Sequence, residues 1–132
     1  MEQIYTIPVN EAFDASREKP ERGCPLCALY HRLEENELDR ILGASMMEPD
    51  IRMETNRLGF CHPHYRKMLK MGQRLSMALT LESHLDRLRQ EISGGGLSFR
   101  GGTPASERIA RLERECYICR RIEFDFSRMT ET

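Results

Sequence analysis

Apolar residues recur every three or four positions along most of this chain, which is the spacing of one face of an α-helix. The pattern is clearest over residues 73–93, whose apolar positions are Ala78, Leu81, Leu85, Leu88 and Ile92. Further helices are predicted over residues 25–42, 49–58 and 61–71, and from residue 103 onward. No segment of useful length alternates as a β-strand would. The pattern therefore predicts an all-α fold, a small helical bundle in which residues 73–93 form the central packing element and Leu85 is buried.

Breaks in this pattern divide the chain into three parts. Residues 1–93 are predicted to form a metal-binding helical domain, of which residues 1–22 are a lead-in and a polar linker. Pro8 favours an extended lead-in, because proline disfavours the helical conformation of the residue before it. Residues 94–102 are predicted to form a glycine-rich loop. Residues 103–132 are predicted to form a C-terminal helix that starts an incomplete second unit.

Two short motifs carry the candidate chemistry. Cys24 and Cys27 form a Cys-x-x-Cys motif, and Cys61 and His64 form a Cys-x-x-His motif. Each motif contains a proline suited to the first turn of a helix, so its two ligands lie on one helix face. Three thiolates and one imidazole are the ligands of a closed tetrahedral zinc site, in which His62 is a less well placed alternative to His64. We therefore expect one zinc ion, with the ligands Cys24, Cys27, Cys61 and His64.

A second Cys-x-x-Cys motif, formed by Cys116 and Cys119, has two interpretations. Its positions continue an apolar helix face, so the two side chains could simply fill a helix interface. Aligned on the first Cys-x-x-Cys motif, it instead repeats that motif and starts a second unit, which makes it a further candidate pair of metal ligands.

The apolar face around this second motif should be covered, because exposed apolar surface is unfavourable in water. The face consists of Ile109, Leu112, Ile122 and Phe126. One way to cover it is a homodimer through the C-terminal helix, in which the two Cys116 and Cys119 pairs could share one metal. The other is to fold it back on residues 73–93. We expect self-association.

Composition narrows the possible partners and the compartment. The 132 residues carry a formal net charge of −1, which argues against bulk attraction to nucleic acid or to an anionic membrane. Residues 1–60 hold seven Lys and Arg against twelve Asp and Glu, whereas residues 61–90 hold six against two, so these segments are expected to pack together.

The N-terminus lacks the features of a signal peptide, and no apolar run is long enough to span a membrane. We expect a cytoplasmic protein, whose five cysteines stay reduced and favour metal over disulfides.

The sequence does not indicate an enzyme. No candidate nucleophile has a credible base, and the glycines of residues 94–102 lack the Lys-Ser/Thr of a phosphate-binding loop. A thioredoxin-like role for Cys24 and Cys27 would require a βαβ setting, which the pattern does not predict. The acidic run Glu34–Asp39 is interpreted as a solvated helix face, and His84 as a partly exposed helix residue.

Several stretches together resemble an uncharacterised bacterial family of helical proteins, built from two Cys-Pro-x-Cys and Gly-Phe-Cys-x-x-His units. These stretches are Ile4–Asn10, Cys24–Cys27, Asn56–His64 and Cys116–Glu123. The resemblance covers essentially the whole chain, which is similar to the N-terminal portion of a longer protein. It implies a cytosolic, all-helical protein and no established activity.

These observations favour a zinc-stabilised helical module that mediates contacts with an unidentified protein partner. One alternative is a thiolate-zinc sensor, in which an oxidant ejects the zinc and loosens the helices. A second alternative is a nucleic-acid binder that uses a basic cluster beside the zinc motif. That cluster consists of Arg66, Lys67, Lys70 and Arg74.

Overall fold

The computed structural model describes residues 2–93 and 104–131, and within these ranges the chain is almost entirely helical. The described residues form seven α-helices, two short 3-10 helices and no strand, which confirms the predicted all-α fold. The α-helices are α1 (Glu2–Glu18), α2 (Pro25–Leu42), α3 (Pro49–Leu58), α4 (His62–Lys70), α5 (Arg74–Ser93), α6 (Pro104–Arg114) and α7 (Tyr117–Glu131). The 3-10 helices are η1 (Pro20–Arg22) and η2 (Ala44–Met47). The predicted loop at residues 94–102 lies outside the described residues.

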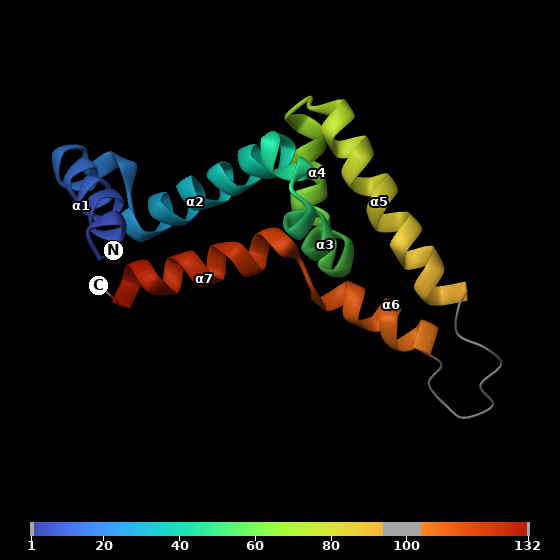
Figure 1. Ribbon diagram of the computed structural model, residues 1–132. Helices are drawn as coiled ribbons and strands as arrows, with labels where there is room; N and C mark the ends of the chain where they lie inside the picture. Colours follow the sequence, from blue (N-terminus) through green and yellow to red (C-terminus); the bar gives the residue numbers. More distant parts are fainter. Residues whose placement is uncertain (1, 94–103, 132) are drawn as a thin grey trace.

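Two long helices, α2 and α7, lie side by side and run in opposite directions (Figure 1). Helix α1 packs across the end of this pair where α2 begins and α7 ends. The short helices α3 and α4 lie at the other end, where α7 begins. Helix α5 packs on α3 and α6. The C-terminal segment therefore folds back within its own chain, with α6 on α5 and α7 mainly on α2.

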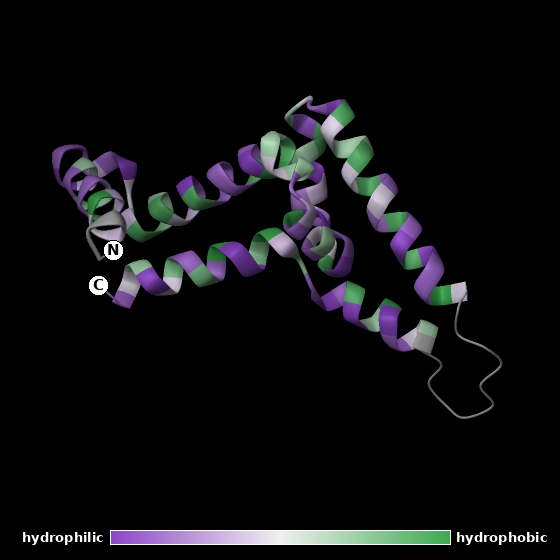
Figure 2. Cartoon of the chain, viewed as in Figure 1, coloured by the Kyte–Doolittle hydropathy of each residue, from purple (hydrophilic) through white to green (hydrophobic). Residues whose placement is uncertain are grey.

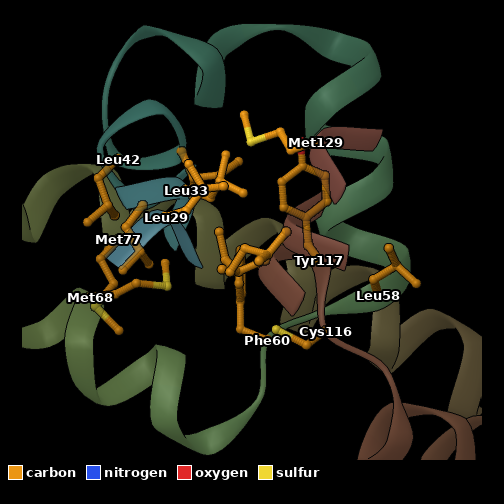
Figure 3. Close-up of a cluster of buried hydrophobic side chains, with 14 residues drawn as sticks. Leu29, Leu33, Leu42, Leu58, Phe60, Met68, Met77, Cys116, Tyr117 and Met129 are labelled. Carbon is orange, nitrogen blue, oxygen red and sulfur yellow. The ribbon is translucent and has the colours of Figure 1, made fainter. Parts of the chain in front are cut away.

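The core lies between α2, α4 and α7, and it extends to Leu58 of α3 and Met77 of α5 (Figure 3). Leu29, Ile118 and Ile122 are among its fully buried side chains. Hydrophilic and hydrophobic residues are interleaved along every helix (Figure 2), as expected for amphipathic helices that expose one face. None of the helices in the described part of the chain is both long and apolar enough to cross a membrane.

Residues 2–18 form a helix, so the prediction of an extended lead-in was wrong. Tyr5, Val9 and Ala12 are spaced for one helix face, and all three pack against the hydrophobic core. Pro8 lies inside the helix, where it removes one backbone donor. Burial of this apolar face overrides the local preference that Pro8 indicated.

The face that α5 buries is not the one that the apolar spacing indicated. Leu85 is 57% exposed, whereas Met77, Thr80 and His84 are buried. The buried positions also recur every three or four residues, but two of them are polar, so a purely hydrophobic pattern passes over them. The prediction that Leu85 is buried was therefore wrong.

Candidate metal centre

Two turns at helix N-termini meet where α7 begins. Cys61 is the N-cap of α4, with His64 in the first turn of that helix. Cys116 immediately precedes α7, and the backbone N–H of Cys119 donates to the Cys116 sulfur at 3.5 Å. Each pair thus lies on the first turn of its helix with both ligand atoms on one side, as the sequence predicted for such motifs.

Backbone contacts hold these two turns together. The chain leaves α3 through Gly59, which has a φ of 65°. The Gly59 carbonyl accepts a hydrogen bond from the backbone N–H of Tyr117 at 2.9 Å. The buried ring of Phe60 packs edge-on against the rings of Tyr65 and Tyr117. The Cys-x-x-His turn is therefore fixed to the start of α7 by main-chain and aromatic contacts.

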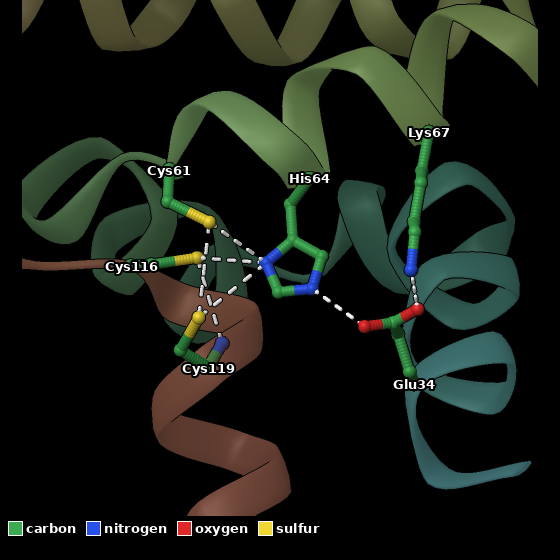
Figure 4. Close-up of polar contacts among 6 residues, drawn as sticks. All are labelled: Glu34, Cys61, His64, Lys67, Cys116 and Cys119. Atoms are coloured by element: carbon green, nitrogen blue, oxygen red, sulfur yellow. Dashed lines mark hydrogen bonds and ion pairs between the residues drawn. The ribbon is translucent and has the colours of Figure 1, made fainter. Parts of the chain in front are cut away.

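Four ligand atoms converge between the two turns (Figure 4). The Nδ1 atom of His64 lies 3.1 Å from the Cys61 sulfur, 3.3 Å from the Cys116 sulfur and 3.5 Å from the Cys119 sulfur. The Cys61 and Cys119 sulfurs are 3.8 Å apart, and all four ligand atoms lie within 4.8 Å of one another. Within the described residues this is the one group of three or more such side chains that could hold a metal ion.

The geometry fits a tetrahedral ion. Metal–sulfur bonds of about 2.3 Å place two sulfurs of a regular tetrahedron about 3.8 Å apart, which matches the Cys61 to Cys119 distance of 3.8 Å. A single imidazole nitrogen carries either one proton or one lone pair, so it cannot form good hydrogen bonds with three thiols at once. Convergence of three sulfurs on the Nδ1 atom of His64 is instead typical of ligands that share a metal.

A carboxylate orients the imidazole. The other ring nitrogen of His64, Nε2, lies 3.1 Å from Oε2 of Glu34 on α2, and Oε1 of Glu34 accepts from the Lys67 ammonium (Figure 4). Burial of Glu34 opposes its charge, but the hydrogen bonds from Lys67 and His64 outweigh burial and lower its pKa. Glu34 therefore stays ionised and can accept the Nε2 proton, which leaves Nδ1 free for a metal.

The surroundings disfavour bare thiolates in this cluster. Burial raises the pKa of Cys116, and burial together with the negative charge of Cys116 raises the pKa of Cys119 to about 12. Without a cation Cys116 and Cys119 would be neutral thiols. A divalent ion supplies the opposite charge and deprotonates the thiols that it binds.

Cys24 and Cys27 do not join this cluster. Both side chains are exposed at the start of α2, the end of the α2–α7 pair that faces away from α3 and α4 (Figure 1). Glu34 reaches the cluster from a point ten residues further along α2, roughly 15 Å from Cys24 at the rise of an α-helix. The structure thus pairs Cys61 and His64 with the second Cys-x-x-Cys motif in place of the first. His62, the alternative ligand, is exposed.

Two residues near the site were misjudged from the sequence. Glu34 and Glu37 are buried, although the acidic run that contains them was interpreted as a solvated face. Their three-residue spacing places both on the face of α2 that contains Leu38 and Ile41, and this was the available signal. His84 is also buried, where its Nδ1 lies 2.8 Å from the Asn56 carbonyl oxygen.

Comparison with known protein families matches residues 1–132 to a family of unknown function, DUF6062. The chain belongs to this family. Neither the curated proteins nor the solved structures compared with it gave a match.

Proposed function

We propose that this member of DUF6062 is a zinc-stabilised helical module, in which the metal has a structural role and a helix face contacts another protein. The observation that carries the proposal is the convergence of Cys61, His64, Cys116 and Cys119 within 4.8 Å. Three sulfurs and one nitrogen match the preference of zinc, and four protein ligands leave no open position for a substrate. This chemistry supports a structural ion over a catalytic one.

The position of the cluster supports the same role. Its ligands are 52 to 58 residues apart in sequence between the two turns, and they join α4 to α7 while Glu34 adds α2. Such a link restricts the unfolded chain and couples metal binding to folding. In small zinc modules this coupled free energy is on the order of 10 kcal/mol. We propose a reducing compartment such as the cytoplasm, where the three thiols would remain available to zinc.

Elemental analysis of protein purified without added metal tests the proposal. We expect one zinc per chain. X-ray absorption at the zinc edge should show sulfur neighbours at about 2.3 Å and a nitrogen neighbour at roughly 2.0–2.1 Å. Cys116→Ser should lower both the zinc content and the melting temperature. Cys24→Ser is the matched control and should change neither. A Cys116→Ser protein that keeps its zinc, or a Cys24→Ser protein that loses it, would contradict this ligand set.

Exposed leucines support a role in protein contacts. Leu69 at the end of α4 and Leu75 at the start of α5 are both largely exposed, and Leu69 lines a groove together with Met68, Met77 and Leu81. Apolar side chains gathered at one place on a surface often mark a protein contact. Crosslinking to a co-purifying protein tests this surface. Loss of the crosslink in Leu69→Asp, and its retention in Leu85→Asp at an exposed position on another part of α5, would support a contact through this surface.

The basic cluster gives less support to nucleic-acid binding. Lys67 is paired with Glu34, and Lys70 borders a hollow that also contains Glu35 and Asp39. Acidic neighbours of this kind oppose the approach of phosphates. Self-association through the C-terminal helix stays a prediction, although Ile122 of the expected face is buried within the chain.

A second candidate function is a thiolate-zinc sensor, and the accessibility of Cys119 favours it. Cys119 is exposed as a residue, although its thiol is partly desolvated, and its sulfur is 3.8 Å from that of Cys61. A peroxide could oxidise this pair to a disulfide, taking two electrons from the sulfurs and releasing zinc and water. Zinc release at low peroxide concentration that a thiol reverses would favour the sensor, whereas retention of zinc under those conditions would favour the structural role.

A further inference from the structure

The two Cys-x-x-Cys turns of this chain have the same local construction. In the first, the backbone N–H of Cys27 donates to the Cys24 sulfur at 3.4 Å. In the second, the backbone N–H of Cys119 donates to the Cys116 sulfur at 3.5 Å. Each turn begins a long helix, α2 or α7, and these two helices pack side by side in opposite directions. The turns therefore lie at opposite ends of one helix pair.

Only the second turn is covered. Ile118 and Ile122, which lie two and six residues after Cys116, are both 0% exposed, and they belong to the same core as Phe60 of the Cys-x-x-His turn. The Gly-Phe-Cys-x-x-His segment thus supplies an aromatic side chain to the core as well as two metal ligands to the cluster.

The equivalent positions after the first turn are open. Leu26 and Tyr30 lie two and six residues after Cys24, and they are 41% and 38% exposed. Together with Cys27, His31 and Phe126 they line an open hollow of about 230 Å³ beside the Cys27 side chain. Two exposed thiols thus lie beside an apolar hollow. At the second turn, the equivalent thiols and apolar side chains face the Gly-Phe-Cys-x-x-His segment.

We propose that Cys24 and Cys27 are the thiolate half of a second zinc site, which a Gly-aromatic-Cys-x-x-His turn of another polypeptide segment completes. That turn would add one thiolate and one imidazole, giving the four ligands that a closed zinc site requires. Its aromatic side chain would cover Leu26 and Tyr30, as Phe60 contributes to the core at the second turn. Zinc binding releases the protons of the three thiols to solvent. The hydrogen bonds that Cys24 accepts from Cys27 lower the pKa of Cys24, whereas the hydrogen bond to Cys24 and its charge raise the pKa of Cys27, so Cys24 is the first of the pair to become a thiolate.

A peptide with the sequence of residues 57–71, the chain's own Cys-x-x-His turn, is a suitable probe. The chain is first loaded with one zinc, and binding of the labelled peptide is then followed by fluorescence anisotropy with and without a second equivalent of zinc. We expect one peptide and one further zinc to bind per chain. Binding should weaken at least tenfold in the double variant Cys24→Ser, Cys27→Ser and in Leu26→Asp, and for a peptide whose Cys and His are replaced by Ser and Ala.

Three results would overturn the proposal. The first is the absence of zinc-dependent binding, and the second is binding that the double variant leaves unchanged. The third is a second zinc taken up by the chain alone as a dimer, since two copies would then complete each other with four cysteines. The exposed positions of Cys24 and Cys27 argue against misfolding as the cause of lost binding, and circular dichroism of the variant checks it. The double variant should keep the first zinc, which we propose is bound by Cys61, His64, Cys116 and Cys119. Its zinc content therefore reports on that site independently of peptide binding.

Discussion

Gly59 connects the candidate metal centre to the rest of the fold. Its φ of 65° is a conformation that side chains with a Cβ rarely adopt. A Cβ atom there would also lie 2.9 Å from Nε2 of His84 and 3.1 Å from Cδ1 of Leu112. The backbone conformation and the close packing both require glycine, at the position whose carbonyl bonds the first residue of α7.

We expect Gly59→Ala to lower the free energy of unfolding by roughly 2–5 kcal/mol, from backbone strain and from overpacking. Gly72 is a matched control, because it has a similar φ of 76°. Its two chain neighbours aside, no described residue lies within 4 Å of where a Cβ atom on Gly72 would be. Gly72→Ala should cost only about 1–2 kcal/mol. Urea denaturation of both variants measures the difference. Equal losses would show that packing against His84 and Leu112 contributes nothing.

His84 should make the stability depend on pH. Burial lowers its pKa below the ordinary value near 6.5 and outweighs the hydrogen bond to the Asn56 carbonyl, and the nearby Arg108 lowers it further. The unfolded chain therefore takes up the proton first, so stability is full above about pH 6.5 and falls as the pH drops toward the folded pKa. The slope from this one group is at most about 1.4 kcal/mol per pH unit.

The variant His84→Asn keeps an N–H donor near the position of Nδ1 and removes the titration. Between pH 7.5 and 5.5, wild type should lose more unfolding free energy than this variant does. Other titrating groups are common to both proteins, so the difference between the two denaturation profiles isolates His84. Parallel profiles would mean that His84 does not resist protonation in the folded state.

At the scale of the helix, α5 shows how a polar residue can belong to a buried face. Met77 is buried on the side that faces the core, whereas Leu85 projects into solvent. We expect Met77→Ala to cost about 2–5 kcal/mol, as for large-to-small changes in a core. Leu85→Ala should cost less than about 1 kcal/mol, as for a surface change. Thermal unfolding of the two variants compares them, and a larger loss for Leu85→Ala would contradict this orientation of α5.

Local interactions determine the features that the sequence predicted in agreement with the structure. Helical periodicity predicted the all-α fold, and the proline-containing turn predicted that Cys61 and His64 lie on one side of a helix start. The choice of partner pair was not local, because it depends on α2 and α7 running in opposite directions, which places Cys116 beside Cys61 and leaves Cys24 at the far end. The helical conformation of α1 likewise depends on the burial of its apolar face against the core. The local conformational effect of Pro8 gives no information about that burial.

For the whole molecule, the Cys61, His64, Cys116 and Cys119 cluster joins two helix starts, and a metal ion bound there would strengthen this link. Helix α7 is held to α2 by buried residues such as Ile122, and α6 is held to α5 by the ion pair of Arg108 with Glu91. The link between the start of α7 and the start of α4 includes the cluster itself and the backbone bond to Gly59. Removal of a metal ion from this cluster should therefore loosen this junction first.

Hydrogen–deuterium exchange with and without a chelator tests this order of events. If the cluster holds the proposed zinc, we expect segments 58–66 and 115–122 to exchange faster once the zinc is removed, because both turns lose the ion that they share. Residues 74–92 should change least, since α5 packs mainly on α3 and α6, touches α4 less extensively and supplies no side chain to the cluster. Cys116→Ser should reproduce the pattern without a chelator, and Cys24→Ser should not. An equal increase in every helix would instead mean that the metal stabilises only the molecule as a whole, with no junction that opens separately.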